Sequence, residues 1–357
     1  MLIWIITHLT EFFPSLNFFS SLIFRALISL LTGFFFTISI GSCLINKLKN
    51  LKIGQVVRYE GPKSHFRKNG VPTMGGILIV MSIISSVLLW THLSNPYIWF
   101  VLFVLVAYGL VGFIDDYQKI VRKNSKGLMA SWKYFFQSII TFFIILVLCI
   151  WDKNSVANKL ILPNWISLCL AYFTLIGTSN AVNITDGLDG LAIIPTIFVT
   201  AGLGLIAWFN SNVTISNYLH IFYSPYLMEI VIFCTAIIGS GLGFLWFNTY
   251  PAEIFMGDIG SLALGATLAI ISILLRQEFL LLVMGGIFVI ETLSVIIQVG
   301  FFKLRGKRIL LMAPLHHHYE LKGLPEPRIT IRFSIISFLL LLMGLVIFFI
   351  QFNLNEL

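Results

Sequence analysis

Five aspartates stand at the ends of long apolar stretches of this chain: Asp115, Asp116, Asp186, Asp189 and Asp258. Charged residues make up only 11% of the sequence, and a charge at the centre of a bilayer costs about 2.5–3.5 kcal/mol on insertion scales. Aspartates at the edge of a membrane, beside runs of Lys and Arg, therefore indicate a site for a metal ion and phosphate groups.

The first cluster places two carboxylates next to each other, at Asp115 and Asp116. Adjacent carboxylates repel, and a divalent ion with oxygen ligands, such as magnesium, would relieve that repulsion. Lys119 follows Asp115 by four residues and shares its face if the helix continues. The alternative is a solvated helix end with an ordinary salt bridge.

The second cluster combines amides, carboxylates and glycines between two apolar stretches. Asn180, Asn183 and Asp186 are spaced three apart and would share one helical face. Gly187 and Gly190 allow a tight turn and close approach of the backbone to a ligand. A helix cap followed by a plain turn is the competing interpretation.

The third cluster precedes another apolar stretch, where Asp258 is followed closely by Ser261. The N-terminus of a helix attracts anions, so Asp258 either caps that helix or holds a cation that in turn holds phosphate. Phe255 could stack on a planar base. The sequence leaves both interpretations of Asp258 open.

Three consecutive histidines, His316, His317 and His318, form the fourth cluster. Successive residues of a helix do not share a face, so three histidines of a regular helix cannot all ligate one metal, whereas a loop could aim two of them. An imidazole near basic residues can also hydrogen-bond phosphate oxygens. Glu291, Ser294 and Gln298 would form one polar face of the preceding span. We expect that face to line a groove through which a lipid phosphate enters.

The elements that carry these residues must be membrane helices. The chain has 357 residues, of which 58% are apolar, and its mean hydropathy is +0.95. The apolar runs are continuous, which favours helices over a barrel. We predict a single all-α polytopic membrane domain over 1–357. Its roughly ten spans are expected at 22–46, 74–92, 98–115, 134–151, 165–183, 191–209, 229–247, 260–275, 279–302 and 333–352.

The basic residues predict how these spans are oriented. All 23 Lys and Arg residues except Arg25, Lys153, Lys159 and Arg276 fall in alternate loops. By the positive-inside rule those loops, which also carry the aspartates and the histidines, are cytoplasmic, and both termini are periplasmic. The net charge of +8 suits anionic lipids and substrates, and we expect no nucleic-acid partner.

Four motifs in this order resemble one enzyme family. They are Asp115-Asp116-x-x-Lys119, Asn183-x-x-Asp186-Gly-Leu-Asp189-Gly, Phe255-Met-Gly-Asp258-x-Gly-Ser261 and His316-His317-His318. Over nearly the whole chain the sequence is similar to the bacterial phospho-N-acetylmuramoyl-pentapeptide transferases. These belong to the polyprenyl-phosphate N-acetylhexosamine-1-phosphate transferase superfamily.

The resemblance implies an enzyme of peptidoglycan synthesis in the bacterial inner membrane, often a homodimer, whose active site faces the cytoplasm. It implies Mg²⁺-dependent transfer of phospho-MurNAc-pentapeptide from UDP-MurNAc-pentapeptide to undecaprenyl phosphate, which yields lipid I and UMP. Direct attack and a covalent intermediate both remain open. The implied metal ligand is Asp258, and Asp115 would deprotonate the lipid phosphate or attack as a nucleophile.

The resemblance also assigns the remaining site residues. The implied catalytic residues are Asp115, Asp116, Lys119, Asp258 and His317. The implied substrate-binding residues are Lys68, Thr73, Lys126, Asn183, Asp186, Asp189, Asn248, Phe255, Ser261, Gln298, His316 and His318.

Two other functions compete with this one. A close relative would use UDP-GlcNAc as donor, although the unbroken histidine triplet favours the muramoyl substrate. A transporter of anionic metabolites is the alternative from another class, but transporters place charged residues near the midplane, often in repeated halves. Here the acidic residues lie at one rim.

Overall fold

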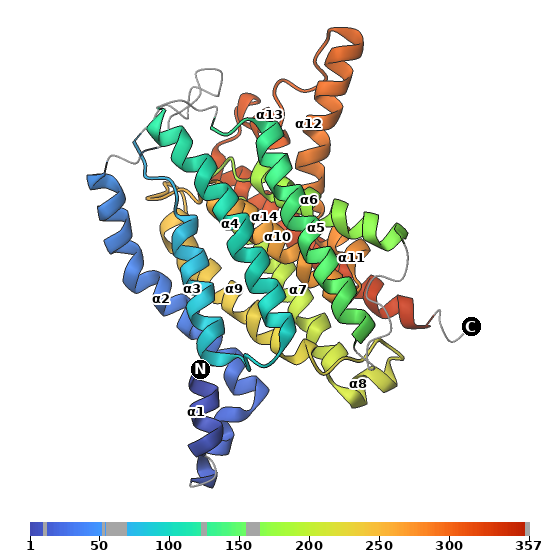
Figure 1. Cartoon of the computed structure of the whole chain (residues 1–357). Helices are drawn as coiled ribbons and strands as arrows, with labels where there is room; N and C mark the ends of the chain where they lie inside the picture. Colours follow the sequence, from blue (N-terminus) through green and yellow to red (C-terminus); the bar gives the residue numbers. More distant parts are fainter. Residues whose placement is uncertain (10–12, 52–53, 55–69, 123–126, 155–164, 354–357) are drawn as a thin grey trace.

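The computed structural model describes residues 1–9, 13–51, 54, 70–122, 127–154 and 165–353, which form a bundle of helices (Figure 1). No β-strand occurs within these ranges, so the predicted all-α fold is confirmed. The helices are α1 (Leu2–Leu9), η1 (Pro14–Ser20), α2 (Leu22–Asn50), α3 (Gly76–Trp90), α4 (Pro96–Val121), α5 (Ala130–Asn154), α6 (Trp165–Thr185), α7 (Ile193–Ser211), α8 (Val213–Tyr218), α9 (Leu227–Asn248), α10 (Gly257–Leu275), α11 (Glu278–Met284), α12 (Gly286–Arg305), α13 (Leu315–Leu321) and α14 (Glu326–Asn353).

Every predicted span corresponds to a helix, with two differences. Among the described residues, nine helices are long and apolar enough to cross a membrane, and α3 is a shorter apolar helix of 15 residues. The ninth predicted span, 279–302, is divided at Gly285 into α11 and α12. Glycine is a poor helix former, and two consecutive glycines explain why the helix breaks there.

The segment before α3 pairs with the loop before α10. The amide of Phe255 donates to the carbonyl of Pro72 at 2.9 Å, and the amide of Gly75 donates back to Phe255 at 2.8 Å. These bonds satisfy backbone groups that a longer α3 would have used. They also bring Thr73 next to the start of α10.

Helix α10 lies in the middle of the bundle, and every residue from Ile259 to Leu275 is buried. Its neighbours approach closely through glycines. A Cβ atom on Gly112 of α4 would lie 2.3 Å from the carbonyl oxygen of Asp258. A Cβ atom on Gly76 of α3 would lie 2.1 Å from the amide nitrogen of Gly260. The first turn of α10 is therefore fixed against α3 and α4.

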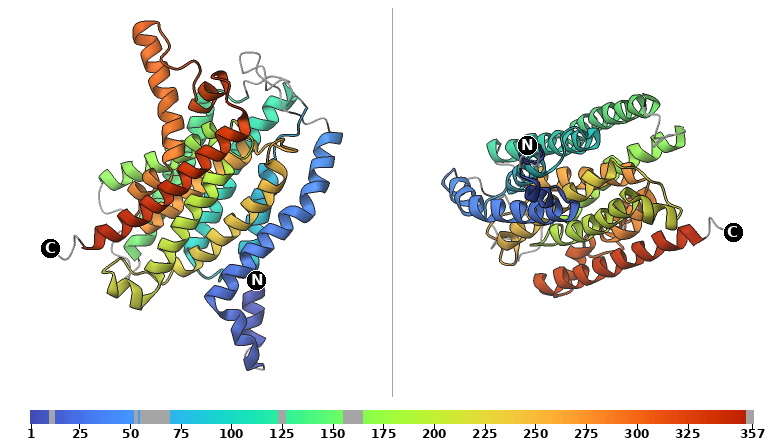
Figure 2. Two further views of the ribbon diagram at one scale, coloured as in Figure 1. Left: turned by 180° about the vertical axis from the view of Figure 1, so that it is seen from behind. Right: turned by 90° about the horizontal axis from the view of Figure 1, so that it is seen from below.

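The two ends of the bundle differ. The C-terminal end of α4, helix α13 and the end of α12 lie together at the upper end of the bundle, while the N-terminus and α1 project from the lower end (Figures 1 and 2). The predicted acidic and histidine clusters therefore share one end.

A buried ion pair lies at the opposite end. The guanidinium of Arg25 in α2 donates to both carboxylate oxygens of Glu229 in α9, at 2.9 and 3.0 Å. The backbone amide of His92, in the α3–α4 connection, donates to the same carboxylate at 2.8 Å. Arg25 is 2% exposed and Glu229 5% exposed, so the pair joins three parts of the fold away from water.

We predict that Arg25→Met lowers stability by about 3–5 kcal/mol, because it leaves the buried Glu229 carboxylate unpaired. Replacing both residues, with Arg25→Met and Glu229→Leu, should recover most of the loss. Thermal unfolding in detergent measures both variants. Equal destabilisation of the single and the double variant would contradict the assignment of the effect to an unpaired charge.

Candidate active site

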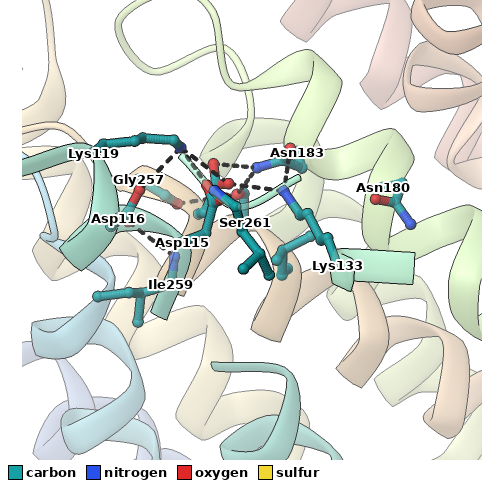
Figure 3. A network of polar contacts seen from close by, with 12 residues as sticks. Asp115, Asp116, Lys119, Lys133, Asn180, Asn183, Gly257, Ile259 and Ser261 are labelled. Atoms are coloured by element: carbon teal, nitrogen blue, oxygen red, sulfur yellow. Dashed lines mark hydrogen bonds and ion pairs between the residues drawn. The ribbon is translucent and has the colours of Figure 1, made fainter. Parts of the chain in front are cut away.

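Three carboxylates from two helices converge on one ammonium group (Figure 3). Helix α4 continues to Val121, so Asp115 and Lys119 share a face, as predicted. The Nζ atom of Lys119 lies 2.6 Å from Oδ2 of Asp115 and 3.2 Å from Oδ1 of Asp116. It also lies 3.1 Å from Oδ2 of Asp258, which belongs to the first turn of α10.

Two further helices complete the surroundings of Asp258. Nζ of Lys133, in α5, lies 2.8 Å from Oδ2 of Asp258. The side-chain amide of Asn183, in the last turn of α6, donates to Oδ1 of Asp258 and to Oγ of Ser261, both at 2.8 Å. The structure thus brings the predicted residues Asn183, Asp258 and Ser261 together with Asp115, Asp116 and Lys119.

Backbone amides hold the other oxygens of the two α4 carboxylates. Leu128 donates to Oδ1 of Asp115 at 2.7 Å, and Ile259 donates to Oδ2 of Asp116 at 3.3 Å. Gly257 permits the second contact: its φ is +72°, and a Cβ atom there would lie 2.5 Å from Oδ2 of Asp116. Backbone amides therefore orient both carboxylates, and only glycine fits beside Asp116 at position 257.

The donor set fits a divalent cation. Asp115, Asp116 and Asp258 each offer one carboxylate oxygen, and these three atoms lie within 4.8 Å of one another. Carboxylate oxygens are the hard ligands that magnesium prefers, usually together with substrate phosphates. Three negative charges face the ammonium groups of Lys119 and Lys133, so the cluster keeps a negative charge that a divalent ion would neutralise.

Asp186 lies in the turn that follows α6, near the same charges. Burial and the negative charges of Asp258 and Asp116 raise the pKa of Asp186 to about 7. The raised pKa reports the excess of negative charge around Asp186 and favours the neutral form of its carboxyl group. Asn180, by contrast, donates to Oε1 of Gln137 at 2.8 Å, and Figure 3 shows it to one side of the carboxylates.

Asp189 and Asn248 hold the turn after α6 against the loop before α10. Oδ2 of Asp189 accepts from the amide of Ala252 at 3.0 Å. Oδ1 of Asn248 accepts from the amide of Gly190 at 3.0 Å, and its Nδ2 donates to the carbonyl of Ile254 at 2.8 Å. Both side chains are buried. These contacts fix the position of Asp186 relative to Asp258.

The histidine triplet lies in helix α13, so the three rings cannot all ligate one metal. Nδ1 of His316 lies 3.1 Å from Oε2 of Glu291, and Nδ1 of His317 lies 2.7 Å from Oε2 of Glu320. Nδ1 of His318 accepts from the amide of Leu311 at 3.1 Å. The three rings have three different partners because successive helical residues point in different directions.

Of the three histidines, His316 contacts the turn that carries Asp186. Its ring is buried, and a Cβ atom on Gly187 would lie 2.3 Å from Nε2 of His316. Gly187 therefore allows α13 to pack directly against the second acidic cluster.

Gln298 and Glu291, both in α12, accept hydrogen bonds from the segment that leads into α13 and from the start of α13 itself. Oε1 of Gln298 accepts from the amides of Ile309 and Leu310 at 3.1 and 3.0 Å. Glu291 accepts from the amide of His316 at 3.2 Å. The amides of Ile309, Leu310 and His316 thus occupy Gln298 and Glu291 on this polar face of α12. That the face lines a groove for the lipid phosphate stays a prediction.

Of the other predicted residues, Thr73 and Phe255 lie close to the site, and two lysines fall outside the described residues. Thr73 lies beside Gly257, since a Cβ atom on that glycine would be 3.1 Å from Oγ1 of Thr73. Phe255 is placed next to it by its backbone bonds to Pro72 and Gly75. Lys68 and Lys126 lie outside the residues that the structure describes.

Sequence reasoning missed Lys133 as a site residue. It follows the basic loop after α4 and was counted only as one of the charges that set topology. Lys133 lies in the first turn of α5. A lysine at the start of a membrane span can extend its side chain toward the same end of the bundle as the aspartates, and this position could have identified it as a site residue.

The comparison with known families agrees with this site. The family described as Glycosyl transferase family 4 matches residues 98–276, which is half of the chain. The matched region contains Asp115, Asp116, Lys119, Lys133 and both clusters around Asn183 and Asp258, while the histidine triplet lies outside it. The chain belongs to glycosyl transferase family 4, the family of polyprenyl-phosphate hexosamine-1-phosphate transferases.

Proposed function

We propose that this enzyme transfers phospho-MurNAc-pentapeptide from UDP-MurNAc-pentapeptide to undecaprenyl phosphate, forming lipid I and UMP for peptidoglycan synthesis. The observation that carries the proposal is the convergence of Asp115, Asp116 and Asp258 on Lys119, with Lys133 on the same carboxylate of Asp258. This arrangement, at one end of a helical membrane bundle, suits a lipid-linked phosphate acceptor and a nucleotide diphosphate donor.

The reaction forms one phosphorus–oxygen bond and breaks another. An oxygen of undecaprenyl phosphate attacks the phosphorus that bears the sugar, and the bond to the UMP oxygen breaks, so that UMP leaves with the electron pair. Phosphoryl transfer depends on positioning and on neutralising charge. The chain contributes the ammonium groups of Lys119 and Lys133 for that purpose.

Asp115 is the residue we propose as the base that removes the proton of the acceptor phosphate. Its carboxylate is held by Lys119 on one oxygen and by the amide of Leu128 on the other. Direct nucleophilic attack by Asp115, with a phosphoaspartyl intermediate, is the other route. Trapping a labelled enzyme with the donor alone separates the two.

Asp258, with Asp115 and Asp116, would hold Mg²⁺. When bound, Mg²⁺ would supply positive charge against the diphosphate and its leaving oxygen. Asn183 keeps one oxygen of Asp258 in place, because its amide also donates to Ser261.

The muramoyl substrate is proposed in preference to UDP-GlcNAc because of the histidine triplet. His316 is fixed by Glu291 and packs on Gly187, beside the turn of Asp186. We propose that a bulky donor extends from its nucleotide toward α13. An assay with both donors discriminates between them. Family membership favours either transferase over an anion transporter.

We further propose the bacterial inner membrane as the location, with the site facing the cytoplasm and the chain acting as one domain within a homodimer. The alternation of basic loops supports this orientation. The described helices from α2 to α14 form one bundle, which supports a single transferase unit.

Asp258→Asn should reduce turnover by a factor of about 10³ or more, because one carboxylate then fails to balance Lys119, Lys133 and a bound cation. Release of UMP in detergent with undecaprenyl phosphate measures this. Glu278→Gln, in α11, serves as the matched control and should stay near wild type. Near wild-type turnover by Asp258→Asn in a folded protein would remove Asp258 from the proposed role.

Lys133→Met should lower kcat by about 10²-fold, because the ammonium 2.8 Å from Asp258 is lost and its charge is not replaced. Lys133→Arg should recover part of the rate. Lys303→Met, at the exposed end of α12, is the control that removes one charge outside the cluster. Equal effects of the changes at Lys133 and Lys303 would show that only net charge matters.

A further inference from the structure

Helix α14 contacts the turn after α6 through the backbone of Asp189. Oε1 of Glu326, the first residue of α14, accepts from the amide of Asp189 at 2.8 Å. One helical turn further along α14, Oγ1 of Thr330 donates to the carbonyl oxygen of Asp189 at 3.2 Å. Residues four apart share a helical face, so one face of α14 satisfies both backbone groups of Asp189.

These hydrogen bonds are shielded from water. Asp189 is 4% exposed, Thr330 7% and Glu326 9%. A buried backbone amide that loses its acceptor cannot turn to solvent for another one, and leaving it unpaired is costly. A change that removes the Glu326 carboxylate is therefore expected to move the turn.

Apolar contacts join the same parts of the chain. Two side chains of the turn, one of α12 and two of α14 form a small hydrophobic cluster separate from the main core: Leu188, Leu191, Ile287, Ile329 and Phe333. The two α14 members lie three and seven residues after the first residue of that helix, on the face that carries both hydrogen-bonding side chains. The turn is therefore packed against α14 as well as bonded to it.

This turn carries Asp186 toward the carboxylate cluster. Asn183, in the last turn of α6, donates to Asp258 at 2.8 Å, and the amide of Asp186 donates to the carbonyl of Asn183 at 3.3 Å. The negative charges of Asp258 and Asp116 act on Asp186 and oppose its ionised form. A turn that was free to move would carry Asp186 away from these charges, so its position must be fixed from another side.

We infer that Glu326 is a positioning residue of the transferase: through the amide of Asp189 it keeps the turn 186–190 where Asp186 faces the nucleotide-sugar donor. The inference rests on the proposed function. Glu326 acts through the backbone and needs no contact with substrate. The family match ends at residue 276, so α14 supplies this contact from outside the matched region.

Kinetics of two variants at position 326 test the hydrogen bond. Glu326→Ala removes the acceptor and should lower kcat/KM for UDP-MurNAc-pentapeptide about tenfold, with the KM for undecaprenyl phosphate unchanged. Glu326→Gln keeps an oxygen that can accept from the same amide and should retain about half or more of the wild-type value. Unchanged kcat/KM in Glu326→Ala, or equal losses in both variants, would overturn the inference.

Thr330→Val provides an independent variant with nearly the same side-chain shape. It removes the donor to Asp189 and should lower kcat/KM for the nucleotide donor about threefold. Ser334→Ala, one helical turn later, is the matched control, because the Ser334 hydroxyl donates to the carbonyl of Thr330 in its own helix. Equal losses from Thr330→Val and Ser334→Ala would contradict a role for the contact with the turn.

Hydrogen–deuterium exchange measures the turn without turnover. In Glu326→Ala the amides of 187–191 should exchange about tenfold faster than in the wild type, while those of α10 keep their protection. Unchanged exchange in the turn, or a uniform rise along the chain, would overturn the inference. Failure of the wild type to transfer to undecaprenyl phosphate would instead overturn the proposed function, and exchange would still report whether Glu326 fixes the turn.

Discussion

The structure depends on keeping three carboxylates within reach of one another at the edge of a membrane. Asp115, Asp116 and Asp258 repel, and burial makes that repulsion stronger. Lys119 and Lys133 offset it from two helices, and Asn183 and two backbone amides fix the oxygens that the lysines do not hold. Close packing makes this possible, because Gly112 lets α4 approach the backbone of Asp258.

The sequence predicted the site residues best where charged residues stand next to long apolar runs. Rare charges beside long apolar runs identified the carboxylates, and the spacing of Asp115 and Lys119 correctly predicted a shared helical face. These inferences hold because they depend on local helix geometry and on the cost of burying charge.

Other features could not be read from the sequence because they depend on contacts between distant segments. Lys133 reaches Asp258 only because α5 packs against α4 and α6. Asn180, although correctly spaced with Asn183, donates to Gln137 in α5. On the polar face of α12, Gln298 and Glu291 bind the segment leading to α13.

Helices α4 and α5 both contribute to the site, since Lys119 of α4 and Lys133 of α5 each contact the carboxylate of Asp258. The central claim remains that Asp115, Asp116 and Asp258 together bind a divalent cation. Titration of the purified protein with Mn²⁺, followed by electron paramagnetic resonance, tests this without substrate. The account predicts binding that Mg²⁺ displaces and that Asp258→Asn abolishes. Equal binding by wild type and Asp258→Asn would contradict it.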